Sequence, residues 1–374
     1  MINVAFTGGG TGGHIFPGLA VAGELNNIPA QRGFRLFWIG SDAGMDRGIV
    51  EEAGFEFFGV PSGKLRRYFS FRNILDFFKV IASFFASRKI LKREKARLLF
   101  SKGGFVSVPP CAAAASLGIP VFTHESDYSP GLATKINARY ASRTGGKIFT
   151  AYEDTGGFFP ERIRSCVMLC GNPIRGVFRS CDAAKGRSFL RTAENERILL
   201  VLGGSQGSQE INALIRAVLD ELTGIYTVVH QSGPGRMWDL PGTEKYKTFP
   251  FIKEELPHVL AAAEIVAGRS GAGIWEWAAL GKPMLLIPLS GSGTRGDQVE
   301  NARYFEKAGA AVVLSGDDAS PAGLIRAVKD LANDERKRRD MAAASKKIGA
   351  LDSAGAIARV IAAAAAQRNV SGGD

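Results

Sequence analysis

The feature that most constrains the fold is a strand, a glycine-rich turn and a helix, which together occur twice about half a chain apart. The first turn is Gly8-Gly9-Gly10-Thr11-Gly12-Gly13-His14, and the second is Gly203-Gly204-Ser205-Gln206-Gly207. Along the whole chain, strand-like apolar runs alternate with helical patterns, as in βαβ units with a parallel sheet. A chain of 374 residues also exceeds the usual size of a single core. We therefore predict an α/β protein with two Rossmann-like domains.

The boundary between the two domains is expected near Gly171-Asn172-Pro173. The first domain would comprise residues 1–173 and the second residues 174–353. An alanine-rich helix at 354–370 would return to the first domain. The expected strands are Asn3–Thr7, Arg35–Gly40, Phe55–Val60, Arg97–Ser101, Ile119–His124 and Lys147–Ala151 in the first domain, and Arg197–Leu202, Tyr226–Gln231, Lys247–Phe251, Ile265–Ala267, Met284–Pro288 and Ala311–Leu314 in the second.

Several classes of protein are disfavoured by missing motifs. The first turn is not followed, about 20 residues later, by the acidic residue of a nicotinamide site, and no G-x-x-x-x-G-K-[ST] of a P-loop occurs. The four cysteines form no C-x-x-C pair and the four histidines have no zinc-like spacing, so we expect no metal or cofactor. A leader peptide and a run of about 18 apolar residues are both lacking, which favours a cytoplasmic protein.

Polar residues next to the glycine turns are the candidates for chemistry. His14 would lie at a helix N-terminus, where it serves either as a general base or as a structural partner of the backbone. A third glycine-rich turn, Gly268–Gly273, leads into a helix whose Glu276 could accept hydrogen bonds from a ribose diol. The stretch Asp297–Ala302 places amides beyond a strand's carboxyl end, where α/β proteins bind ligands.

Positive charge is concentrated between Lys64 and Arg97, which contain eleven Lys and Arg and two acidic residues for a local net charge of +9. The whole chain carries only +11. Apolar positions in this segment follow a helical period, which predicts a basic amphipathic helix lying on an anionic membrane. A core helix with a charged rim and a nucleic-acid contact are the alternatives, and the second is disfavoured. The apolar positions are 71, 74, 75, 78, 81, 82 and 85.

These motifs together resemble those of the MurG family of peptidoglycan N-acetylglucosaminyltransferases, glycosyltransferase family 28. The resemblance rests on Gly9–Ala20, Gly203–Gly207, His124-Glu125, Gly171–Arg175 and Gln298-x-x-Asn301-Ala302. It implies a GT-B fold and an inverting transfer of N-acetylglucosamine from UDP-GlcNAc. The acceptor would be the C4 hydroxyl of the muramoyl sugar of lipid I, the product lipid II, and the location the cytoplasmic face of the membrane.

The resemblance also implies roles for individual residues. Catalysis would depend on His14, with Glu125 and Asp127 as alternatives. Two departures from the family pattern affect the site. His124-Glu125-Ser126-Asp127 stands where the family usually has His-Glu-Gln-Asn, and the turn from Arg269 to Glu276 is one residue shorter. The residues expected to bind substrate are Thr11, Gly12, Gly13, Asp127, Arg175, Ser205, Ile252, Ala272, Glu276 and Gln298.

Three other functions stay open at this stage. A glycosyltransferase acting on diacylglycerol would share the second domain. A nicotinamide-dependent oxidoreductase would share the general fold. A noncatalytic sugar-nucleotide or membrane-scaffold protein would keep the turns without the chemistry.

Overall fold

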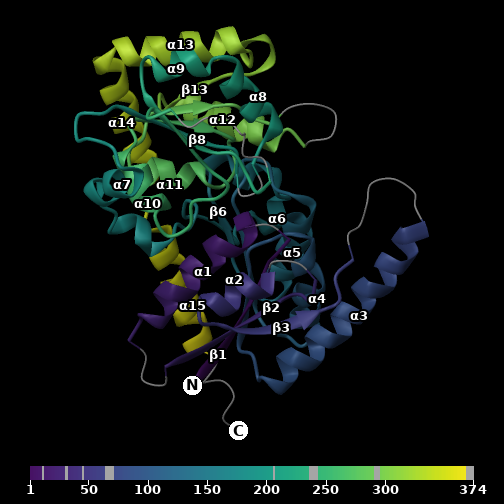
Figure 1. Ribbon diagram of the computed structural model, residues 1–374. Helices are drawn as coiled ribbons and strands as arrows, with labels where there is room; N and C mark the ends of the chain where they lie inside the picture. The colour runs from purple at the N-terminus through teal and green to yellow at the C-terminus, as the bar shows by residue number, and fades with distance from the viewer. Residues whose placement is uncertain are drawn as a thin grey trace. The chain divides into compact units, whose positions relative to one another are not determined.

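A computed structural model describes residues 1–10, 12–29, 33–43, 46–63, 71–204, 207–235, 243–289 and 295–367, with the backbone alone for 71–75 (Figure 1). The chain divides into two compact units. Unit 1 comprises Met1–Arg175 and Asp352–Asp374, and unit 2 comprises Gly176–Leu351. This division lies two residues from each boundary expected from the sequence.

Unit 1 contains a parallel seven-stranded sheet in the order β3-β2-β1-β4-β5-β6-β7. Six of these strands coincide with the expected ones. The seventh, β7, was not expected, because it is a three-residue edge strand whose Met168 and Leu169 are exposed. The strands are β1 (Ile2–Thr7), β2 (Phe34–Ser41), β3 (Glu56–Val60), β4 (Leu98–Ser101), β5 (Val121–Glu125), β6 (Ile148–Thr150) and β7 (Val167–Leu169).

Helices cover both faces of this sheet, because alternate strand residues point to opposite faces. Val4 and Phe6 of β1 belong to one apolar core with helices α1 and α15, whereas Ala5 faces a second core built with α3, α4 and α5. The helices of unit 1 are α1 (Gly12–Asn26), α2 (Asp46–Glu52), α3 (Phe71–Arg93), α4 (Val108–Ser116), α5 (Leu132–Arg143), α6 (Glu161–Arg164) and α15 (Ser353–Gln367).

Unit 2 contains a parallel six-stranded sheet in the order β10-β9-β8-β11-β12-β13, and all six strands were expected. Its strands are β8 (Ile198–Leu202), β9 (Thr227–Gln231), β10 (Tyr246–Phe249), β11 (Ile265–Gly268), β12 (Met284–Leu286) and β13 (Ala311–Val313). Its helices are α7 (Ala183–Leu190), α8 (Gln209–Ala217), α9 (Leu219–Thr223), α10 (Leu256–Ala262), α11 (Ile274–Ala279), α12 (Asp297–Lys307), α13 (Pro321–Asn333) and α14 (Glu335–Gly349).

The order of the strands reverses direction at one point in each sheet, between β1 and β4 in unit 1 and between β8 and β11 in unit 2. Such a switch point is where open α/β sheets bind ligands, because the connections on its two sides leave in opposite directions. The glycine-rich turns after β1 and β8 each directly follow a strand at a switch point. The expected α/β class with two Rossmann-like parallel sheets is confirmed.

The stretch Glu335–Gln367 is long and apolar enough to span a membrane by length and composition, and 39% of its most apolar window is buried. It consists of two helices, α14 in unit 2 and α15 in unit 1, separated at residues 350–352. Ile357, Ala358 and Ile361 of α15 are fully buried in the core shared with α1 and β1. Helix α15 is therefore a core helix of unit 1.

We expect Ile361→Ala to lower the free energy of unfolding of unit 1 by about 2–5 kcal/mol, because it removes buried apolar atoms and leaves a cavity. Denaturant unfolding monitored by the fluorescence of Trp38 in unit 1 would measure the loss. The exposed Gln367→Ala is the matched control in the same helix. Equal stability of the two variants would show that α15 does not support the core.

Candidate functional site

The turn after β1 is braced by two side chains from neighbouring segments. The Trp38 indole Nε1 donates to the Gly8 carbonyl at 2.9 Å, and the Asp46 carboxylate accepts the Gly10 N–H at 3.0 and 3.2 Å. A Cβ on Gly9 would lie 2.0 Å from Asp46 Oδ2, so a larger residue there would displace the Asp46 carboxylate. Burial raises the pKa of Asp46, although the backbone hydrogen bonds oppose this. Sequence reasoning missed Asp46, which follows β2 and lies far from the turn in sequence.

His14 is half-buried in the first turn of α1 and faces the loop that follows β4. A Cβ on Gly104 would lie 3.3 Å from His14 Nδ1, and one on Gly103 would lie 3.8 Å from Cδ2. The imidazole therefore packs against the glycine backbone of the loop after β4, the neighbouring strand at the switch point. The structure brings His14 together with Gly12 and with the β4 loop, while Gly13 is exposed beside them and Thr11 lies outside the described residues.

Glu125 ends β5 and is buried. Its Oε1 accepts the N–H groups of Ser126 at 2.8 Å and Asp127 at 3.0 Å, and its Oε2 accepts the Gly131 N–H at 3.0 Å. Burial raises the pKa of Glu125, and the nearby Asp127 charge adds to this rise. The carboxylate therefore anchors the loop 125–131, which carries the half-exposed Asp127.

Lys102 directly follows β4 and is 1% exposed. Its ammonium donates to the Ser126 hydroxyl. Burial lowers the pKa of Lys102 to about 8, although the charges of Glu125 and Asp127 oppose this. A lysine this deeply buried is rare without charged partners. The burial of Lys102 could not be predicted from the sequence, which shows only a cation at the end of an apolar strand.

Arg175 ends the first segment of unit 1, and its guanidinium carbon lies 4.8 Å from the centre of the Phe16 ring of α1. This distance is typical of a cation–π contact. Arg175 therefore lies against the helix that follows the first glycine turn.

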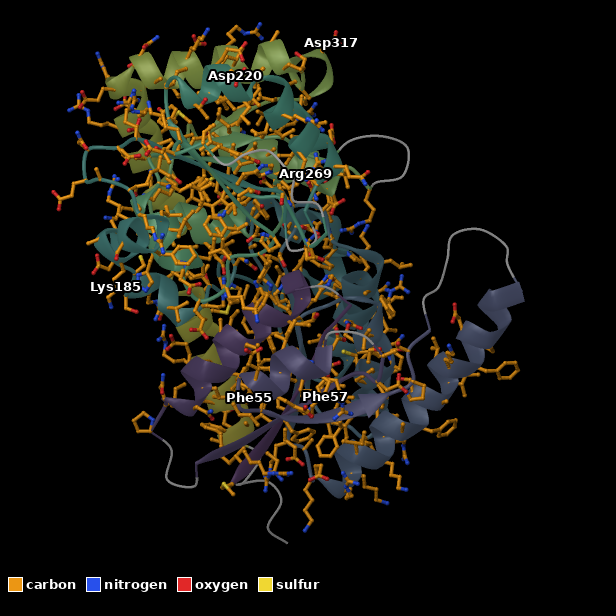
Figure 2. All side chains as sticks on the ribbon, in the orientation of Figure 1. Phe55, Phe57, Lys185, Asp220, Arg269 and Asp317 are labelled. Atoms are coloured by element: carbon orange, nitrogen blue, oxygen red, sulfur yellow. The ribbon has the colours of Figure 1, made fainter. Side chains whose placement is uncertain are left out.

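In unit 2, Arg269 joins the turns that follow β8 and β11. The guanidinium of Arg269 (labelled in Figure 2) donates to Ser208 Oγ at 2.8 Å and to the Ile287 carbonyl at 3.0 Å, and it pairs with Glu210. Ser208 also caps α8. A Cβ on Gly207 would lie 2.1 Å from a backbone oxygen, so the turn requires glycine. Ser205 lies outside the described residues.

Gln231, at the end of β9, also holds the turn that follows β8. Its Nε2 donates to the Gly204 carbonyl at 3.2 Å, and its Oε1 accepts the Ile252 N–H at 2.9 Å. Ile252, expected to contact uracil through its backbone, thus has its N–H engaged within the protein. A uracil base could accept a hydrogen bond from this N–H only after the hydrogen bond to Gln231 has broken.

Gln298 begins α12 beside the turn after β11. Its backbone carbonyl accepts the Ser270 hydroxyl at 2.6 Å, and its Oε1 accepts the Leu289 N–H at 2.9 Å. Asn301 donates to the Ser270 carbonyl at 3.0 Å. The Gln298 carbonyl and the Asn301 amide therefore fix the start of α12 against that turn, and the Gln298 amide fixes it to the segment after β12.

The turn with Ala272 and Gly273 leads into α11, which is only six residues long. Glu276 is half-buried in its first turn, next to the buried Trp275 and Trp277. The expected order of glycine turn, short helix and carboxylate is therefore present. Across the described ranges, no three His, Cys, Asp or Glu side chains gather as a metal site.

Two family models cover most of the chain: the glycosyltransferase family 28 N-terminal domain matches residues 4–145, and the C-terminal domain matches residues 198–357. The chain belongs to glycosyltransferase family 28. A curated relative from Treponema denticola is 48% identical over 353 residues, which cover 89% of this chain and 88% of the relative. Another from Shouchella clausii is 41% identical, covering 89% of this chain and 92% of the relative.

Both relatives are named UDP-N-acetylglucosamine–N-acetylmuramyl-(pentapeptide) pyrophosphoryl-undecaprenol N-acetylglucosamine transferase. Among solved structures, MurG of Acinetobacter baumannii matches with a TM-score of 0.70 at 22% identity, covering 96% of this chain and 98% of that one. At this identity the match concerns the fold alone, and the expected GT-B fold is confirmed. The expected family and the expectation of an enzyme, a glycosyltransferase, are confirmed as well.

The buried Lys102 should give stability a distinct pH dependence. Its pKa in the folded chain, about 8, lies below the ordinary 10.5, so the unfolded chain binds more protons between these values. The stability of the native protein relative to Lys102→Met should therefore rise as the pH increases from 8 to 10.5, by up to about 3 kcal/mol. Urea unfolding of both proteins at pH 7.5, 9 and 10.5 would measure this, and a constant difference would contradict it.

Proposed function

We propose that this family 28 enzyme transfers N-acetylglucosamine from UDP-GlcNAc to the C4 hydroxyl of the muramoyl sugar of lipid I, with inversion, to form lipid II for peptidoglycan. The observation that carries the proposal is the motif Gly9–Ala20, whose described part forms a braced turn and helix with His14 at the switch point. The relatives that bear the name of this activity cover about nine-tenths of the chain. A diacylglycerol glycosyltransferase is the alternative.

The nucleotide is assigned to unit 2 and the chemistry to unit 1. Glu276 would accept two hydrogen bonds from the ribose diol, and Gln298 would offer its amide nitrogen to the sugar, since its oxygen is engaged by Leu289. Ser205, Ala272 and the backbone of Ile252 complete the expected donor contacts, together with Arg175 of unit 1.

Negative charge on the departing UDP needs compensation. Backbone N–H groups of glycine-rich turns that precede helices supply it, because they are preorganised and need no rearrangement during the reaction. Gly12, Gly13 and Thr11 would contribute such groups from unit 1.

An inverting transfer needs a base on the face opposite the leaving group. His14 is the first candidate, because histidine is the side chain best suited to take a proton near neutral pH and its ring lies on the glycine backbone at the switch point. Asp127 is the second candidate. Glu125 suits the role less well, because both of its oxygens accept backbone N–H groups. Its engagement indicates that it positions the loop that carries Asp127.

The test is incubation with UDP-GlcNAc and a short-chain lipid I analogue, measuring UDP release and a disaccharide product. His14→Ala should lower kcat by about 10²-fold with little change in UDP affinity. Glu276→Ala should instead weaken UDP binding by about 1–3 kcal/mol. Product formation from diacylglycerol but not from lipid I would favour the alternative, and near-normal turnover of His14→Ala with an inactive Asp127→Ala would move the role to Asp127.

Helix α3 is the proposed membrane contact. Its buried positions are mostly polar, with Ser83, Ser87 and Leu91 facing unit 1, whereas Phe78 and Phe85 are 61% and 63% exposed. The helix runs along the outer side of unit 1 beside α4 and β3 (Figure 1). An exposed aromatic face on an amphipathic helix is typical of shallow insertion into a bilayer.

Phe84, which is not among the expected stripe positions, is partly buried and packs against the core of unit 1, so it does not belong to the exposed face. Phe77 is 55% exposed and Ile81 39% exposed, so both do belong to it. The part of the basic segment at 64–70 lies outside the described residues.

Exposed cations follow the aromatic face along α3, among them Lys79, Arg88, Lys89 and Lys92. Each contributes about 1 kcal/mol of attraction near an anionic surface, reduced by salt. We therefore propose peripheral binding to the anionic cytoplasmic face of the membrane, where the polyprenyl chain of lipid I is anchored. No nucleic-acid contact is part of this proposal.

The triple substitution of Phe77, Phe78 and Phe85 by Ser should abolish binding to vesicles that contain phosphatidylglycerol and leave the fold and UDP binding intact. Co-sedimentation with these vesicles and with pure phosphatidylcholine vesicles, at low and high salt, measures both contributions. Val177→Ser, an exposed apolar site of unit 2, is the control. Unfolding of the triple variant would instead identify the three rings as core residues.

A further inference from the structure

The loop after β4 supports the His14 ring with a backbone shape that favours glycine. Gly103 and Gly104 have φ angles of 87° and 78°, in the left-handed region. A Cβ on Gly104 would lie 3.3 Å from His14 Nδ1 and 2.7 Å from the Gly9 carbonyl, so Gly104 lies against both the imidazole and the first glycine turn. The position of the ring therefore depends on what holds this loop.

Two serine hydroxyls hold these two glycines. Ser101 Oγ, at the end of β4, accepts the Gly103 N–H at 3.1 Å. Ser107 Oγ, at the end of the single 3₁₀ turn Phe105–Ser107, donates to the Gly104 carbonyl at 2.8 Å. Both serines are fully buried, and each glycine beside His14 has one of them as its partner.

Asn137 of α5 joins the two serines. Its Nδ2 donates to Ser101 Oγ at 3.1 Å and to Ser107 Oγ at 2.8 Å, and the residue is fully buried. Ser107 gives its single hydroxyl hydrogen to the Gly104 carbonyl, so it can only accept from Asn137. Asn137 Oδ1 has no hydrogen-bond partner among the described residues, so reversing the amide would leave two buried N–H groups unpaired in place of one oxygen. One amide nitrogen is therefore the donor to both serines.

Asparagine is a costly residue at this position. It is a poor helix former, and burying an amide costs free energy unless the amide is hydrogen-bonded. Its neighbours Ala138 and Ala141 on the buried face of α5 are apolar and belong to the core of unit 1. An apolar side chain would serve that core, so what Asn137 adds is its pair of hydrogen bonds to the serines.

We propose that Asn137 is a positioning residue, which fixes Gly103 and Gly104 through the two serines and thereby sets the position of the His14 imidazole. It acts on the transfer reaction only through His14. Its relevance to catalysis rests on the proposed function, whereas its effect on the ring does not.

The imidazole resonances of His14 report the position of the ring without substrate. In the full chain with isotope-labelled histidine, His14→Ala identifies these resonances among those of the four histidines. Asn137→Ala should shift or broaden them, because the backbone against which the ring packs is no longer fixed. The resonances of His230 and His258 in unit 2 should stay unchanged.

Two smaller substitutions each remove one connection and keep Asn137. Ser101→Ala frees the Gly103 N–H, and Ser107→Ala frees the Gly104 carbonyl. Each should cause part of the change seen in Asn137→Ala, and they test the proposal even if that variant does not fold.

The matched control is Thr144→Val at the end of α5. Thr144 Oγ1 accepts the Val121 N–H at 3.0 Å and donates to the Tyr140 carbonyl at 2.8 Å, so its loss breaks hydrogen bonds at the start of β5 and leaves the loop after β4 intact. Unmoved His14 resonances in the asparagine and serine variants, or an equal change in this control, would overturn the proposal.

Turnover of UDP-GlcNAc and the lipid I analogue tests the link to catalysis. Asn137→Ala should lower kcat by about tenfold or more through misplacement of His14, with UDP affinity little changed because the nucleotide is assigned to unit 2. In a His14→Ala background, the same substitution should change kcat by less than about twofold, since the ring on which it acts is gone.

The two backgrounds separate positioning from a general loss of structure. An equal fall of kcat in both would reject the proposal, because a destabilised fold lowers activity whether or not His14 is present. Absence of lipid I turnover by the native enzyme would instead reject the proposed function and leave the resonance result standing.

Discussion

In each unit, the chain crosses the sheet in opposite directions from one pair of adjacent parallel strands, β1 and β4 or β8 and β11. The connections that leave this pair do not cover each other, so backbone lies open at the carboxyl ends of the strands. Glycine is required at Gly207, where a Cβ would meet the Ser232 carbonyl, and at Gly9 it leaves room for the Asp46 carboxylate. The placement of His14 and Arg269 follows from these approaches.

Turns built from glycine have little rigidity of their own, because glycine loses more conformational entropy on folding than any other residue. In both units, polar side chains from other segments supply the missing constraint. Asp46 and Trp38 hold the turn after β1, and Gln231 and Arg269 hold the segments around β8 and β11. Burying such groups is costly, and each is accepted only because it is hydrogen-bonded. The perturbed pKa of Asp46 results from this arrangement.

The strands and the glycine turns could be predicted from the sequence because they depend on local patterns. Of the thirteen strands in the described ranges, twelve coincide with runs expected from the sequence, whereas β7 is a half-exposed edge strand of three residues and leaves no local signal. Lys102, Asp46 and Gln231 could not be found in this way. Their roles depend on burial and on partners 24, 36 and 27 residues away, respectively. The exposure of the apolar face of α3 could also not be predicted, because helical periodicity identifies such a face but not whether other segments cover it.

The burial of α3 bears on the choice between a core helix and the membrane contact that we propose. A core helix buries its apolar stripe, but Ser83 and Ser87 of α3 are 2% and 0% exposed while the Phe78 and Phe85 rings are more than half exposed. Serine contributes little hydrophobic free energy, so the helix is held to unit 1 chiefly by Leu91 and the partly buried Phe84 and Ile90. Exposed phenylalanines add nothing to that attachment. This exposed face and the cations alongside it support the contact with an anionic surface that we propose.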